Sequence, residues 1–173
     1  MNRKMHSLGG ALRRYATLFQ RNGLDVKTEP LDKLILKTFL AGWGYDNVTL
    51  SDEKYYLTDW ENWKIIIEDD LTNSYKYIAD SHDCDNFSDH FNALVATTYG
   101  LNTSGRLSVE LFTQEGKHIG WHRCSIIVAK EGTKMVGYVY DPMINMHDGY
   151  CKIGDGEIRI KNWIYEGWYA SFN

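Results

Sequence analysis

The sequence has few of the residues that divide a chain or cross-link it. Only two prolines occur, and no repeat or low-complexity stretch marks a linker between separately folding parts. The three cysteines, Cys84, Cys124 and Cys151, are odd in number and far apart, unlike the even, closely spaced sets of disulfide-stapled secreted domains. We therefore expect at least one free thiol and a single domain over residues 1–173.

Long apolar runs and an excess of basic charge are also missing. No stretch of about 18 apolar residues occurs, as a membrane-spanning helix would need, and residues 1–14 lack the hydrophobic segment of a secretion signal. The 19 Lys and Arg residues face 23 Asp and Glu residues, so the formal net charge is −4. We expect a cytoplasmic protein with no nucleic-acid or membrane partner.

Apolar residues are plentiful enough for a packed core. They make up 43% of the chain, and aromatic residues alone reach 14%, which excludes wholesale disorder. Helical spacing of apolar residues predicts helices in the first half and at the start of the second, at 12–22, 28–42, 58–70 and 84–98. Runs rich in β-branched and aromatic residues predict strands further on, at 106–112, 121–129 and 134–140.

Helices followed by strands predict an α+β fold, in which N-terminal helices pack against a C-terminal antiparallel β-sheet. Residues 1–50 would form a helical extension, and residues 55–173 would form the core of the domain.

Cys84 is placed where a thiol becomes reactive. Asp83 is a favourable N-cap for a helix that carries Phe87 and Phe91 on one face, so Cys84 falls in the first turn. The unpaired N–H groups and the positive end of the helix dipole stabilise a thiolate there. The same N–H groups can bind an oxyanion formed after the thiolate attacks a carbonyl.

His122 and Asp141 supply a base and an orienting acid. His122 lies in a predicted strand with Cys124 and Ile126 on the same face, and that face is expected to meet the helix that begins at Cys84. A hairpin turning near Gly132 would place His122 roughly opposite Tyr140 and Asp141. The sequence thus predicts a Cys84, His122 and Asp141 catalytic triad.

This order of residues resembles the papain-like cysteine peptidase superfamily. The stretches Trp60-Glu61-Asn62-Trp63, Asp83-Cys84-Asp85-Asn86-Phe87-Ser88 and Asp141-Pro142, together with His122, are similar to the C-terminal peptidase-like domain of the Marasmius oreades agglutinin and related bacterial and phage proteins. The resemblance implies a papain-like fold and a thiol protease or amidase that hydrolyses an amide or peptide bond in a peptide, protein or cell-wall substrate. It also implies a small bacterial or phage-encoded protein, located in a cytoplasm, in a host cell or in a virion.

Three other interpretations remain open. The chain is a binding or structural protein that keeps a papain-like fold without catalysis. The second interpretation is metal binding, because one segment is crowded with potential ligands: Asp80, His82, Asp83, Cys84, Asp85 and His90. The paired spacing of zinc ligands is missing, however, so no metal or other cofactor is expected. The third interpretation is a sugar-binding surface, because Trp121, Trp163 and Trp168 are able to stack on pyranose rings.

Overall fold

A computed structural model describes residues 26–45, 47–144, 148–154 and 157–172, and strands contribute more of these residues than helices do. The strands are β1 (Glu29–Asp32), β2 (Val48–Leu50), β3 (Lys54–Leu57), β4 (Ser104–Thr113), β5 (His118–Glu131), β6 (Lys134–Tyr140), β7 (Tyr150–Lys152), β8 (Ile158–Ile160) and β9 (Trp163–Phe172). The α-helices are α2 (Lys33–Ala41), α3 (Trp60–Glu68) and α4 (Cys84–Tyr99), and Thr72–Ser74 forms a short 3-10 helix.

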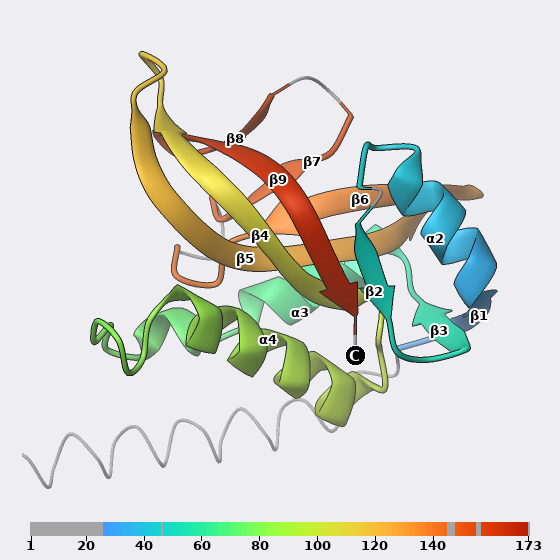
Figure 1. The fold of residues 1–173 in the computed structure, drawn as a ribbon. Coiled ribbons are helices and arrows are strands. Elements are labelled where there is room, and N and C mark those ends of the chain that lie inside the picture. Colours follow the sequence, from blue (N-terminus) through green and yellow to red (C-terminus); the bar gives the residue numbers. More distant parts are fainter. Residues whose placement is uncertain (1–25, 46, 145–147, 155–156, 173) are drawn as a thin grey trace, which may run out of the picture.

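A curved sheet of seven strands forms the centre of the molecule (Figure 1). Its strands follow the order β2-β9-β4-β5-β6-β7, with β8 paired to β9. The pairs are antiparallel except for β2, which runs parallel to β9. Strands β1 and β3 form a separate two-stranded sheet. Strand β5 therefore lies between β4 and β6. Strand β4 has 10 residues, whereas β6 has only 7.

Both faces of the sheet are covered, because alternate residues of β5 are buried in two different cores. Cys124, Ile126 and Val128 pack with residues of α2, β1 and β3. Ile127 and Ala129 pack with residues of α3 and α4 on the other face. In Figure 1 helices α3 and α4 run beneath the sheet, while α2 lies beside its far end.

The predicted α+β arrangement is wrong. Strands β1, β2 and β3 lie in the half of the chain that was expected to be helical, and helix α2 covers a different face of the sheet from α3 and α4. The molecule is thus a mainly β structure with helices inserted between strands. A propensity argument missed this because β1, β2 and β3 have only three or four residues each, too few to reveal a period of two.

The boundaries of two predicted helices also differ from the structure. The predicted helix at 28–42 begins only at Lys33, because residues 29–32 pair with β3. Its buried side chains are Leu36 and Leu40, whereas Leu34 and Ile35 are exposed. The predicted helix at 58–70 begins at Trp60, and its buried side chains are Trp60, Trp63, Ile66 and Ile67. The predicted helix at 12–22 lies outside the described residues.

No helix in the described part of the chain combines the length and the apolar character needed to cross a bilayer.

Candidate functional site

Cys84 occupies the first position of helix α4, as predicted from the sequence. Asp83 has the extended backbone of an N-cap, and its N–H donates to Oδ1 of Asn86 at 3.1 Å in a capping box. The loop before the helix is closed by Ile78 and His82, whose backbones exchange two hydrogen bonds of 2.8 Å. These bonds fix the direction in which the chain enters the helix, and they leave the thiol of Cys84 partly exposed.

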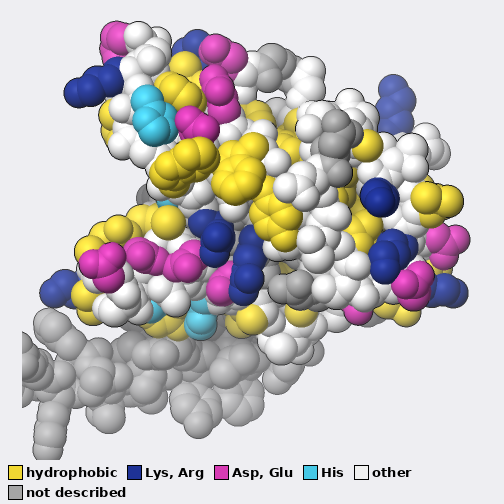
Figure 2. All heavy atoms as spheres, viewed as in Figure 1, with side chains coloured by type: hydrophobic (Ala, Val, Ile, Leu, Met, Phe, Trp, Pro, Cys, Tyr) yellow, Lys and Arg dark blue, Asp and Glu magenta, His cyan; other side chains and the backbone are white. Residues whose placement is uncertain are grey.

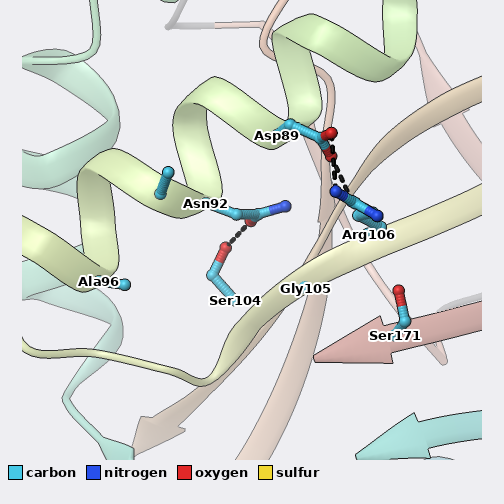
Figure 3. A pocket seen from close by; sticks show the side chains of 8 residues that line it. Asp89, Asn92, Ala96, Ser104, Gly105, Arg106 and Ser171 are labelled. Atoms are coloured by element: carbon cyan, nitrogen blue, oxygen red, sulfur yellow. Dashed lines mark hydrogen bonds and ion pairs between the residues drawn. The ribbon is translucent and has the colours of Figure 1, made fainter. Parts of the chain in front are cut away.

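Polar contacts attach helix α4 to the sheet. The buried hydroxyl of Ser88 donates to a backbone carbonyl of β5 at 2.8 Å. On the same side of the helix, the guanidinium of Arg106 forms a two-bonded ion pair with Asp89, and Ser104 donates to the side chain of Asn92 (Figure 3). A cavity of about 230 Å³ between α4 and β4 is lined by Asp89, Asn92, Ser104 and Arg106. Because they bind one another across it, they hold the helix in position.

The start of α4 meets β5 where that strand has an open edge. Strand β6 pairs with β5 only as far as Ser125, which lies opposite Tyr140. At His122 and Arg123 the described residues pair β5 with β4 alone. The N–H of Arg123 and the side chain of His122 therefore reach the sulfur of Cys84, and both form hydrogen bonds with it.

Asp141 follows directly after β6 and is bonded to three donors. Its Oδ2 accepts from Nε2 of His122 at 2.8 Å and from the hydroxyl of Tyr165 at 2.8 Å, while its Oδ1 accepts from the N–H of Met143 at 3.0 Å. The Asp141 side chain is only 4% exposed. Since Nε2 binds Asp141, Nδ1 is the ring nitrogen left for Cys84. The carboxylate thereby fixes the orientation of the imidazole.

The electrostatics favour a thiolate paired with an imidazolium. The hydrogen bond from His122 lowers the pKa of the Cys84 thiol, burial raises it, and the backbone of Arg123 lowers it further, so that the net change is downward. Burial alone would lower the pKa of His122, but hydrogen bonds to Asp141 and Cys84 outweigh it and raise the pKa to about 9. Because the pKa of the thiol falls while that of the imidazole rises, the pair favours a proton on the ring rather than on the sulfur.

The structure brings the three predicted residues together by a different register from the expected one. Tyr140 lies opposite Ser125 instead of His122. Asp141 still reaches His122 because the chain leaves the sheet after Tyr140, so Asp141 is not constrained to a pairing position. Helix α4 also packs on the face of β5 that carries Ser125, whereas the sequence argument placed it on the face of His122.

Tyr165 is a member of the site that the sequence reasoning missed. It lies on β9, and burial raises its pKa, so the hydroxyl remains a donor to Asp141. Its ring centroid is 6.0 Å from that of His122. Nothing local in the sequence distinguishes Tyr165 from the other tyrosines. Only the adjacency of β9 and β4 in the sheet brings this part of the chain near the site.

A groove of about 250 Å³ opens in front of the thiol. Helix α4 contributes one wall and strands β4, β5 and β9 contribute the other; the lining residues are Asp83, Cys84, Asp85, Ser108, Trp121, His122, Arg123 and Trp168. Arg123 and Asp85 form an ion pair of 3.5 Å. In Figure 2, apolar side chains above a hollow in the surface face charged side chains along α4 below it. Cys84 is therefore accessible to a ligand.

The remaining cysteines and acidic residues do not extend this chemistry. Cys124 is fully buried, and burial raises the pKa of its thiol, so this side chain packs in the core as a small apolar residue. Among the described residues, no group of three or more His, Cys, Asp and Glu side chains is arranged to hold a metal ion. The crowded segment around residues 80–90 therefore provides no such cluster.

The fold and the groove define a mainly β domain with a paired cysteine and histidine at a sheet edge. No family model and no curated protein matches the chain. Two of the solved structures that match its fold are the PSL1a–E64 complex and the Polyporus squamosus lectin bound to the human-type influenza-binding epitope Neu5Acα2-6Galβ1-4GlcNAc. Both have a TM-score of 0.55, with 15% and 14% sequence identity.

The match covers 83% of this chain but only 50% and 49% of the two neighbours, so the chain spans about half their length. At this identity the likeness establishes the fold alone.

The comparisons correct three expectations drawn from the resemblance. The neighbours are chains of a lectin rather than a papain-like peptidase, so the predicted membership of that superfamily is wrong. The classification as a hydrolase and cysteine protease that depended on it is wrong for the same reason. The expected peptide or protein substrate also gains no support, because the ligand of one neighbour is a sialylated oligosaccharide.

Proposed function

We propose that the chain is a binding protein whose groove holds a nucleophilic thiolate, with Cys84, His122 and Asp141 acting together. The observation that carries the proposal is the continuous set of hydrogen bonds from the sulfur of Cys84 through the His122 ring to Asp141. Several features of the site support the same chemistry. The thiol begins a 16-residue helix, its pKa is lowered, and the groove in front of it is open.

This arrangement suits acyl transfer from a bound carbonyl compound. The Cys84 thiolate attacks the carbonyl carbon, and the oxyanion that forms lies near the backbone N–H of Cys84 at the start of α4. The His122 imidazolium then gives its proton to the leaving group as the bond to that group breaks, and a thioester remains on Cys84. Asp141 keeps the ring turned toward the sulfur throughout, because three donors hold its carboxylate in place.

Selective alkylation tests the thiolate. At about pH 6, where an ordinary thiol with a pKa of about 8.5 is almost entirely protonated, iodoacetamide should modify Cys84 stoichiometrically and leave Cys124 and Cys151 largely intact. Peptide mapping by mass spectrometry identifies the modified residue. His122→Ala should slow the modification of Cys84 at least tenfold. Equal slow labelling of Cys84 and Cys151 in the wild-type protein would reject the proposal.

E64, the compound present with the first neighbour, provides a second probe. E64 carries an epoxide, and a thiolate opens an epoxide to form a stable thioether. We expect a single adduct on Cys84 and none in Cys84→Ala. Cys151→Ala is the matched control, because Cys151 is also a partly exposed free thiol and its removal should leave the adduct unchanged.

The second candidate function is binding without any covalent step. It is supported by the fold shared with two lectin structures and by the aromatic wall of the groove. A glycan array separates the candidates. If binding of a glycan is retained in full by Cys84→Ala and Cys84 fails the alkylation test, non-covalent recognition is the function of the groove.

A further inference from the structure

Trp121 and Trp168 are two of the most exposed large apolar side chains in the described chain. They are 67% and 51% exposed, and their ring centroids are 5.7 Å apart with an angle of 78° between the ring planes. They come from β5 and β9, which are separated in the sheet by β4. The two indoles therefore meet across an intervening strand and form a corner on the wall of the groove that contains Cys84.

A β-bulge directs Trp168 into this corner. Ser108 of β4 lies opposite Tyr169, but the next residue of β4, Val109, lies opposite Gly167, so Trp168 is an extra residue on β9. A bulge changes the direction of the side chain it carries, and bulges occur often beside functional sites. Without the bulge, the strict alternation of side chains along β9 would fix the face of the sheet on which Trp168 lies. The local irregularity thus serves to place an exposed indole beside the thiol.

The polar side chains around the corner are engaged with each other. Arg123 pairs with Asp85, and Asp85 shares a hydrogen bond with Asp83, which raises the pKa of Asp83 and lowers that of Asp85. The charged wall opposite the indoles is therefore largely satisfied within the protein. The part of the groove that gains most from a ligand is the apolar corner, since exposed aromatic surface is released from water there.

We propose that Trp121 and Trp168 form a subsite for an aromatic group carried by the ligand next to the carbon that Cys84 attacks. An aromatic ring placed in the corner stacks on one indole and meets the other edge to face, which are the two favoured geometries of aromatic pairs. The inference rests on the proposed function, because it places this ring in the same groove as the reactive sulfur. The two tryptophans thus select the ligand, and Cys84, His122 and Asp141 carry out the reaction.

Haloacetamides with different substituents on nitrogen test the subsite. The second-order rate of modification of Cys84 is measured with iodoacetamide, N-benzyl iodoacetamide and N-iodoacetylglucosamine. An aromatic pair contributes about 0.5–1.5 kcal/mol, so the benzyl reagent should react about two- to tenfold faster than iodoacetamide. This ratio should fall to about one in Trp121→Ala and in Trp168→Ala. Trp121→Phe and Trp168→Phe should retain part of it, because a ring remains.

Trp163→Ala is the matched control. Trp163 is a 36% exposed tryptophan on β9 that does not line the groove, so its removal should leave the ratio unchanged. A ratio near one in the wild-type protein, or a ratio that Trp121→Ala and Trp168→Ala leave intact, would overturn the subsite. Preference for the glucosamine reagent would overturn its aromatic character. Slow reaction of Cys84 with iodoacetamide itself would contradict the proposed thiolate, whereas the ratio of the two rates tests the subsite alone.

Discussion

His122 is the residue on which the electrostatics of the site depend. Its pKa of about 9, against an ordinary value of 6.5, requires the hydrogen bonds to Asp141 and Cys84 to exceed the effect of burial. The ring is therefore protonated at neutral pH and loses its proton only as the pH rises through about 9. A proton NMR titration of the imidazole should give a midpoint near that value.

Replacing Asp141 by Asn tests the cause of this shift. The variant removes the negative charge, so the midpoint of the His122 titration should move down toward 6.5. Glu53→Gln is the control, since Glu53 is an exposed carboxylate that pairs with Lys33, and it should leave the midpoint unchanged. A titration midpoint near 6.5 in the wild-type protein would contradict the ion pair.

Tyr165 contributes to the site through Asp141. In Tyr165→Phe the carboxylate keeps the bond from His122 but loses a buried donor at 2.8 Å. Hydrogen bonds to charged groups contribute about 1.5–3 kcal/mol, so the free energy of unfolding in a urea titration should fall by about that amount. The rate at which iodoacetamide modifies Cys84 at about pH 6 should fall as well, because the ring is held less firmly.

Tyr169→Phe provides the comparison. Tyr169 also lies on β9 and donates to Thr49 at 3.0 Å, but this bond is exposed. Its loss should change the free energy of unfolding by less than about 0.5 kcal/mol and leave the alkylation rate unaltered. Equal effects of the two variants would show that Tyr165 has no special connection to the site.

The sequence was informative about the site because local rules apply to its members. A good N-cap and an apolar helical face placed Cys84 at a helix start, and a predicted hairpin turning near Gly132 placed His122 close to Asp141. Tyr165, Trp121 and Trp168 were harder to assign. Tyr165 joins the site through the pairing of β9 with β4, and the bulge that orients Trp168 is signalled only by Gly167, a lone glycine inside the strand.

At the level of elements, one close contact fixes β6 against the segment after α2. Gly137 lies directly beneath the ring of Trp43, and a Cβ added at residue 137 would lie 2.0 Å from a ring carbon. Gly137→Ala forces the indole or the strand to move. Overpacking of this kind costs about 1–3 kcal/mol, which should appear as a loss of unfolding free energy in urea.

Lys37→Ala is the control for Gly137→Ala. Lys37 is an exposed residue of α2, and surface substitutions usually change stability by no more than about 0.5 kcal/mol. A Gly137→Ala protein as stable as Lys37→Ala would mean that Trp43 does not pack on β6 as described.

The same elements explain which parts of the fold were predictable. Helices α3 and α4 and strands β4, β5 and β6 have 7 to 16 residues each and carry clear patterns. Strands β1, β2 and β3 are short, and they form because distant partners hold them: β2 pairs with β9 more than 100 residues later, for example Val48 with Ala170. Tertiary pairing overrode local propensity there.

At the scale of the whole molecule, the site exists because parts of both sheet faces and of one sheet edge converge. Helix α4 brings Cys84 from one face, while Tyr165 belongs to the core on the other face. His122 lies between them, where β5 extends past the end of β6. The proposed relay therefore depends on the correct curvature and order of the whole sheet.

The ultraviolet absorbance of the thiolate tests this account most directly. The difference in absorbance between the wild-type protein and Cys84→Ser is followed as the pH is raised, which isolates Cys84 from Cys124 and Cys151. Because His122 lowers the pKa of the Cys84 thiol, the thiolate signal should be present below the ordinary thiol pKa of about 8.5. A signal that appears only at about pH 9 or above, unchanged by His122→Ala, would contradict the thiolate–imidazolium pair.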